Sequence, residues 1–143
     1  MEENTMKKFA KITAVALVVV MVLAVLVACG PASDPQKAID ALKKHEYAAA
    51  KDSLVVPFAL KALGVEGIDT VVSGTKSVKD GDKTKLETVT IVYFTDAKAA
   101  KEAWSKVEGY ANQENKDKDS DWTVKQSGAM IYYGTSAAIK AAH

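Results

Sequence analysis

A long apolar run near the start of the chain constrains this sequence more than any other feature. Residues 12–27 contain one polar side chain, that of Thr13, and the lysine-rich residues 6–11 precede them. The only cysteine of the 143-residue chain, Cys29, follows directly after Ala28. A positive segment, an apolar run and a small residue are typical of a leader that directs export. We therefore expect globular structure only from the residues that follow this leader.

The end of the leader, Leu26-Val27-Ala28-Cys29, resembles the lipobox of bacterial lipoproteins, with a branched residue three positions before the cysteine and a small residue directly before it. The resemblance covers the leader alone. It implies cleavage between Ala28 and Cys29 and diacylglycerol transfer to the Cys29 sulfur. Because each buried methylene contributes ~0.8 kcal/mol, two or more acyl chains would hold the protein stably at a membrane.

This resemblance divides the chain into a signal peptide (residues 1–28), a lipidated tether (29–34) and one globular domain (35–143). It also implies export and a location on the outer face of the cytoplasmic membrane, or at the outer membrane of a two-membrane host. Two questions about the leader stay open. An apolar run near the ~17-residue lower limit of a membrane helix is also compatible with an uncleaved span. Met1 and Met6 are both candidate start residues, because acidic residues stand before the positive segment.

The charge balance argues against a nucleic-acid partner. Outside the leader, basic and acidic residues are equal in number, and every basic residue is lysine. Without a basic surface, the release of counterions that drives nucleic-acid binding has no source. Without arginine, the chain lacks the planar group that binds phosphate or carboxylate with two hydrogen bonds. A lone cysteine also excludes an intramolecular disulfide and a zinc cluster of cysteines.

The first part of the mature chain has a helical pattern. Asp34 and Pro35 are typical of a helix start, and apolar residues follow at helical spacing as far as Ala49. A second apolar stretch over residues 54–63 ends before Gly64, which favours a short helix. We therefore predict an N-terminal helical segment.

From Ile68 onward the apolar residues alternate, which indicates strands. The predicted elements are strands over residues 68–79 and 86–95, a helix over 96–111, a loop over 112–121, strands over 122–126 and 129–133, and a short helix from residue 135. The longer helix has an apolar stripe that we expect to pack into the core through Trp104 and Val107. The fold class is therefore α+β, in which two ββα units follow the helical segment and form a four-stranded antiparallel sheet.

An internal similarity supports the two units. Residues 92–103 align without a gap with residues 131–142, and in both segments a strand with paired aromatics leads into an alanine-rich helix. The alternative is that alanine-rich helices after strands look alike by chance.

The motifs that could carry catalysis or bind a metal lack the neighbouring residues or the secondary structure that this chemistry needs. Ser73 and Lys76 have the spacing of serine–lysine acyl enzymes, but they stand in a predicted strand, where residues three apart point to opposite faces. Residues 117–121 have the alternating acids of a calcium loop without its glycine and final glutamate. His45 and His143 are far apart and have no cysteine partner. We therefore predict no catalytic residues, no metal and no cofactor.

Four aromatic residues, Tyr93, Trp122, Tyr132 and Tyr133, concentrate near one end of the predicted sheet and form a candidate binding surface. Two alternatives follow. Helices cover both faces of the sheet, the helices of the ββα units on one face and the N-terminal pair on the other, and the rings fill the core. Otherwise one face stays partly open as an aromatic-floored groove or a dimer surface.

These observations favour a non-enzymatic, membrane-anchored lipoprotein of the cell envelope. Its partners would be membrane lipid through acylated Cys29, together with an envelope protein or a small ligand, which the domain would bind or sense. The alternative function is an envelope hydrolase whose active site matches none of the motifs considered.

Overall fold

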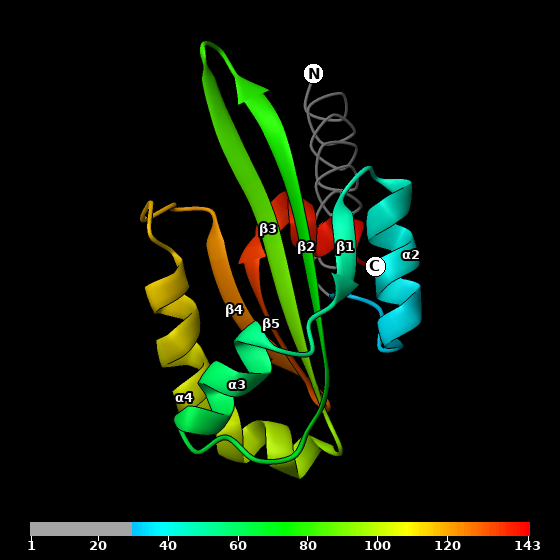
Figure 1. Ribbon diagram of the computed structural model, residues 1–143, viewed down its shortest axis with the longest axis vertical. Helices are drawn as coiled ribbons and strands as arrows, with labels where there is room; N and C mark the ends of the chain where they lie inside the picture. Colours follow the sequence, from blue (N-terminus) through cyan, green and yellow to red (C-terminus); the bar gives the residue numbers. More distant parts are fainter. Residues whose placement is uncertain (1–29) are drawn as a thin grey trace, which may run out of the picture.

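The computed structural model describes residues 30–143, so the predicted signal peptide, Ala28 and Cys29 lie outside the described residues. The described part has an α+β fold, in which helices pack on an antiparallel sheet (Figure 1). This confirms the predicted fold class. In chain order the elements are α2 (Pro35–Lys44), β1 (Ala48–Lys51), α3 (Val55–Ala62), β2 (Ile68–Asp80), β3 (Lys83–Phe94), α4 (Ala97–Glu114), β4 (Trp122–Ser127), β5 (Met130–Thr135) and α5 (Ser136–Ala141).

The sheet formed by residues 30–143 has five strands in the spatial order β1-β2-β3-β5-β4, and each neighbouring pair is antiparallel. Both predicted hairpins, β2–β3 and β4–β5, are confirmed. The β2–β3 turn passes through Gly81, whose φ of +64° suits glycine. β1 pairs with β2 only as far as Thr75, and β5 pairs with β3 only from Val89, so the β2–β3 hairpin projects beyond its neighbours as a two-stranded ribbon (Figure 1).

Strand β1 corrects the prediction of four strands and of a first helix that extends to Ala49. α2 ends at Lys44, and Glu46 has a positive φ of 68°. The N–H groups of Glu46 and Tyr47 return to carbonyls in the last turn of α2, a helix-ending motif that usually has glycine at the position of Glu46. Backbone pairing with β2 then overrides the helix preference of the alanines at 48–50.

Two hydrophobic clusters lie on the two faces of the sheet. Neighbouring residues of β5 point to opposite faces, so Tyr132 packs in a cluster with α2 and α5, and Tyr133 packs in a cluster with α3 and α4. We name these the α2/α5 face and the α3/α4 face. Helices therefore lie on both faces, as the first alternative predicted, but the grouping differs because α2 and α3 are on opposite faces.

The helices of the two ββα units also lie on opposite faces, which corrects the prediction that they share one. The element order β2-β3-α4 and β4-β5-α5 is as predicted. Gly134, near the end of β5, has a φ of +145°, and a Cβ at this position would collide with the carbonyl oxygen of Thr88 on β3. The first unit has Thr95 at the aligned position. Glycine therefore allows the second unit a backbone path that is closed to threonine.

Helix α4 starts as predicted and ends later than predicted. The Asp96 carboxylate caps it by accepting the N–H of Ala99 at 2.7 Å. The helix continues to Glu114, so the first residues of the predicted loop over 112–121 are helical. Val107 is fully buried, whereas Trp104 is only partly buried and packs at the edge of the cluster.

The first described residues are held against the domain. The Ala32 N–H donates to the Ala142 carbonyl at 2.9 Å, and the Tyr93 hydroxyl donates to the Ala32 carbonyl at 2.7 Å. His143 Nδ1 lies 3.0 Å from the Gly30 carbonyl oxygen. Residues 30–32 of the predicted tether are therefore fixed to the α2/α5 face.

Candidate ligand-binding groove

A groove of about 440 Å³ lies on the α3/α4 face, between the start of α3, the β2–β3 hairpin and the segment that follows α4. Its lining combines the rings of Trp122 and Tyr133, apolar side chains that include Val55 and Leu86, and a row of hydroxyl groups from β2, β3 and β5. The hydroxyl residues are Ser73, Thr75, Thr88, Thr90 and Thr135. Mostly apolar walls with a few convergent polar groups are typical of ligand sites.

Trp122 and Tyr133 form the aromatic part of the lining. They come from adjacent antiparallel strands, β4 and β5, and their ring centroids are 6.0 Å apart at an interplanar angle of 42°. Tyr133 is only 2% exposed, and Trp122 is partly buried. The tilted arrangement is a favourable geometry for two aromatic rings.

Both rings carry a polar atom that lacks a partner. The Tyr133 hydroxyl oxygen and Trp122 Nε1 are buried, and neither makes a hydrogen bond to any residue in the described part of the chain. Buried polar groups are nearly always paired, because leaving one unpaired costs roughly 1–3 kcal/mol. Two hydrogen-bonding groups of residues that line the groove are therefore left unpaired, and both atoms are covered in this structure.

The phenol of Tyr133 stays neutral at ordinary pH. Burial raises its pKa well above the usual range for tyrosine, and the Thr90 hydroxyl, which approaches it without reaching hydrogen-bond geometry, acts in the opposite direction. A neutral phenol can both donate and accept a hydrogen bond. In this neutral form the phenol is a hydrogen-bonding group.

Asp52 fixes the α3 side of the groove. Its carboxylate accepts the backbone N–H groups of Leu54, Val55 and Val56 at 3.0, 2.9 and 2.9 Å, which caps the first turn of α3. Burial raises the pKa of Asp52, but these N–H groups outweigh that effect and hold the pKa below its usual range. Asp52 is therefore ionised and already engaged by the backbone.

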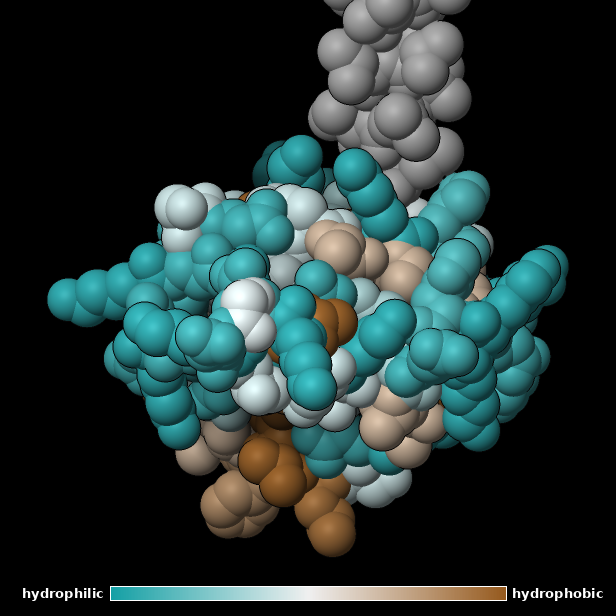
Figure 2. All heavy atoms as spheres, turned by 90° about the horizontal axis from the view of Figure 1, so that it is seen from above, coloured by the Kyte–Doolittle hydropathy of each residue, from teal (hydrophilic) through white to brown (hydrophobic). Residues whose placement is uncertain are grey.

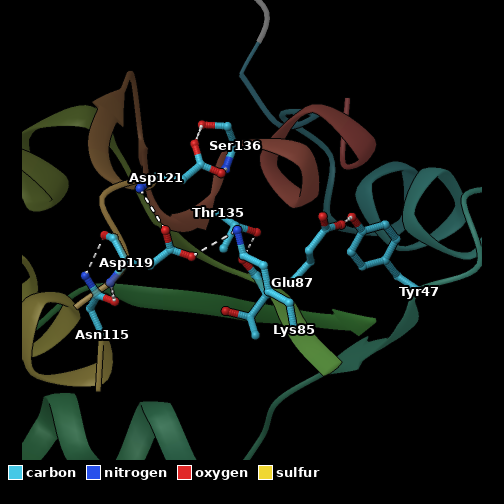
Figure 3. Close-up of polar contacts among 9 residues, drawn as sticks. Tyr47, Lys85, Glu87, Asn115, Asp119, Asp121, Thr135 and Ser136 are labelled. Carbon is cyan, nitrogen blue, oxygen red and sulfur yellow. Dashed lines mark hydrogen bonds and ion pairs between the residues drawn. The ribbon is translucent and has the colours of Figure 1, made fainter. Parts of the chain in front are cut away.

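The opposite wall is the acidic segment after α4, which the sequence predicted as a solvated charged loop. The Asn115 side chain accepts the Asp119 N–H at 2.9 Å and donates to the Asp119 carbonyl at 3.1 Å (Figure 3). One Asp119 carboxylate oxygen accepts the Asp121 N–H at 2.9 Å, and the other lies 3.3 Å from Lys85 Nζ on β3. The segment is therefore folded and tied to the hairpin.

Asp121 ties the same segment to α5. Its two carboxylate oxygens accept the Ser136 hydroxyl at 2.5 Å and the Ser136 N–H at 3.2 Å (Figure 3). Asp119 also has partners for its carboxylate, because the Asp121 N–H and Lys85 hold its pKa below the usual range.

Residues 30–143 contain no group of three or more histidine, cysteine or acidic side chains that could hold a metal ion.

The four aromatic residues predicted as one binding surface do not form one. Trp122 and Tyr133 line the groove, but Tyr93 and Tyr132 are buried on the α2/α5 face, each 5% exposed. The Tyr93 hydroxyl also has a partner already, because it donates to the Ala32 carbonyl. The prediction placed all four at one end of the sheet without separating them by face, whereas residues 132 and 133 must point in opposite directions.

Ser73 and Lys76 also separate. Ser73 lines the groove, whereas Lys76 Nζ donates to the His45 carbonyl at 3.1 Å and lies 5.4 Å from the centre of the Tyr47 ring. The two side chains therefore lie on opposite faces of the sheet, as the alternation of a strand predicts.

The exposed side of α3 was not among the candidate sites predicted from the sequence. Leu54, Val55 and Phe58 are 77%, 71% and 78% exposed. A signal was present in the sequence, because residues 54–60 are apolar on every side of a helix that can bury only one side. We name these three residues the apolar α3 surface.

Within residues 30–143, no helix is long and apolar enough to cross a membrane. Comparison of the chain with protein-family models, with curated proteins and with solved structures found no match.

Proposed function

We propose that this protein is a lipid-anchored, non-enzymatic binding domain of the bacterial cell envelope, and that it takes its ligand in the groove over Trp122 and Tyr133. The observation that carries the proposal is that Trp122 and Tyr133 line this groove while their polar atoms, Trp122 Nε1 and the Tyr133 hydroxyl, are buried and bond to no other described residue. A ligand that turns the two rings toward the groove and supplies an oxygen to Trp122 and a polar group to Tyr133 would remove the cost of leaving them unpaired.

The neighbouring carboxylates already have hydrogen-bond or ion-pair partners within the chain, which supports binding rather than catalysis. Asp52 caps α3, Asp119 pairs with Lys85, and Asp121 accepts two hydrogen bonds from Ser136. The pKa values of Asp52 and Asp119 are held below the usual range, which makes both carboxylates weak bases. Their arrangement therefore suits a rigid recognition site.

The lipobox-like residues Leu26–Cys29 support the anchor, and the packing of residues 30–32 suggests its consequence. Gly30 follows the acylated Cys29 directly and is held beside His143, so the lipid would fix the domain close to the membrane in a defined orientation. The groove is on the other face of the sheet from these contacts. The proposed ligand site would then stay open to the envelope.

Two measurements test the two parts of this proposal. Cells that express the full chain are fed an alkyne fatty acid, and we expect label on the wild type and none on Cys29→Ser at equal protein levels. A label that persists in Cys29→Ser, or a wild type without label, would contradict the anchor.

For the groove, the full chain is placed in phosphatidylcholine nanodiscs on a Trp104→Phe background, so that Trp122 is the remaining tryptophan. Short blocked peptides with basic, acidic or neutral side chains, and N-acetylglucosamine as a neutral sugar, serve as probes. We expect one class to shift the Trp122 emission, with weaker binding in Thr90→Val. If no class changes the emission, or if the protein turns over a probe, the binding proposal is wrong.

A further inference from the structure

We infer that the groove and the apolar α3 surface together bind a positively charged polypeptide segment of a partner protein. The inference rests on the proposed function and names the ligand of the same site. It joins three observations, which are the exposed apolar side chains beside the groove, the excess of acidic groups around it, and the chemistry of its two unpartnered atoms.

The apolar α3 surface continues the groove. Val55 belongs to both, Phe58 is in the first turn of α3, and Leu54 directly precedes the helix, where its carbonyl accepts the Phe58 N–H at 3.2 Å. Leu86, which is 53% exposed, faces the groove from β3. Figure 2 shows strongly apolar side chains projecting together at the lower edge of the view, below a mostly hydrophilic surface. Clustered large apolar side chains with a polar surround mark interaction sites, whereas single ones do not.

The occupant must be larger than the groove. Leu54 and Phe58 do not line the cavity of about 440 Å³, so a small molecule inside it would leave both in water. A polypeptide segment that lies along α3 and places one side chain in the groove would cover both. Binding energy at such interfaces is concentrated in a few well-packed apolar and aromatic groups.

The charge around the groove favours a basic segment. Four carboxylates line it, those of Asp52, Glu114, Asp117 and Asp119, against a single described lysine, Lys116. Lys85 offsets Asp119 from outside the lining, and the balance still stays negative. Two other lysines, at positions 51 and 61, flank α3 in the sequence and do not line the groove.

The unpartnered atoms match a peptide. Both atoms are covered in the free protein, so the rings must turn on binding; a backbone carbonyl can then accept the Trp122 Nε1–H, and a lysine ammonium or a backbone N–H can donate to the Tyr133 hydroxyl oxygen. A second copy of this chain fits less well, because a symmetric contact would place one acidic groove against another. An anionic lipid surface would be repelled by the same carboxylates.

The test uses the full chain in phosphatidylcholine nanodiscs on the Trp104→Phe background. The probes are three blocked peptides of equal length that alternate leucine with lysine, glutamate or serine. We expect the lysine–leucine peptide to shift the Trp122 emission, to bind at least about tenfold more tightly than the other two, and to weaken as salt is raised. Tighter binding of the glutamate or serine peptide would overturn this inference and leave the proposed function standing.

Two variants separate the apolar and the charged contributions. Phe58→Ser changes an exposed side chain and is expected to weaken the lysine–leucine peptide about tenfold. The double variant Glu114→Gln and Asp117→Asn is expected to weaken it about fivefold. The double variant Asp80→Asn and Asp82→Asn at the exposed hairpin tip removes the same number of charges, so it is the matched control and should change nothing. Equal effects of the two double variants would show that only net charge matters, which contradicts the inference.

The remaining arms address other occupants. If the wild type associates with itself in solution and Phe58→Ser abolishes this, a second copy covers the surface. If brominated lipids in the nanodisc quench Trp122, the membrane covers it. Either result overturns the inference. If no probe affects Trp122 at all, the proposed function fails with it.

Discussion

The two faces of the sheet differ in how completely their polar groups are used. On the α2/α5 face, the Tyr93 hydroxyl bonds to the Ala32 carbonyl and the Tyr47 hydroxyl bonds to Glu87 at 2.7 Å. On the α3/α4 face, the Tyr133 hydroxyl and Trp122 Nε1 bond to no described residue, and the apolar α3 surface stays exposed. Two tyrosine hydroxyls on the α2/α5 face therefore have partners within the chain, whereas two buried polar atoms on the α3/α4 face have none among the described residues.

The same contrast explains why α3 differs from α2. α2 buries Ala38, Ile39 and Leu42 along one stripe and exposes polar residues on its other side. α3 buries Val56 and Leu60 but also presents apolar side chains outward. An outward apolar side contributes nothing to the stability of the chain alone, so a contact outside the chain is the physical reason that we propose for it.

The largest effect on stability should come from the core on the α2/α5 face. Leu42 is fully buried, so Leu42→Ala should lower the free energy of unfolding by roughly 2–5 kcal/mol through lost burial and a cavity. Leu54→Ala removes the same atoms from a side chain that is 77% exposed and should change it by less than about 0.5 kcal/mol. Denaturant unfolding of both variants measures this. Similar losses would mean that Leu54 is packed against the rest of the chain and that the apolar α3 surface is not exposed.

A smaller effect should come from the cap that positions α3 beside the groove. Asp52→Ala should cost about 1 kcal/mol at neutral pH, because three N–H groups lose their acceptor. The folded-state pKa of Asp52 lies below its unfolded value, so its contribution is present above the unfolded pKa and is lost as pH falls through the folded pKa. Unfolding curves of wild type and Asp52→Ala should therefore converge in acid. A gap that is independent of pH would mean that the carboxylate charge is not what caps α3.

Much of the fold could be predicted because it follows from local patterns. Alternation identified both hairpins, and Asp34 and Asp96 marked helix starts that the structure confirms. Strand β1 could not be found this way. Alanines favour a helix, and only pairing with a distant strand makes residues 48–50 extended. Glu46 also gave no sign of a chain reversal, because glycine is the usual residue at that position.

The groove was only half predictable. Trp122 and Tyr133 could be chosen as aromatic candidates, but their association with Asp52 and with the folded segment around Asp119 depends on the packing of distant elements. The sequence also could not separate Tyr93 from Tyr133. Whether a tyrosine hydroxyl finds a partner is decided by a single backbone carbonyl, here that of Ala32, which lies far away in the chain.

The difference between the two faces is tested most directly by two tyrosine-to-phenylalanine variants, one on each face. Tyr93→Phe removes a bonded hydroxyl and leaves the Ala32 carbonyl unpaired, so it should lower the free energy of unfolding by about 1 kcal/mol. Tyr133→Phe removes a buried hydroxyl that has no partner among residues 30–143, so the protein without ligand should keep its stability or gain slightly. Both are measured by denaturant unfolding. A loss for Tyr133→Phe as large as that for Tyr93→Phe would mean that the protein already satisfies its phenol, and it would contradict the claim that this face is kept for a ligand.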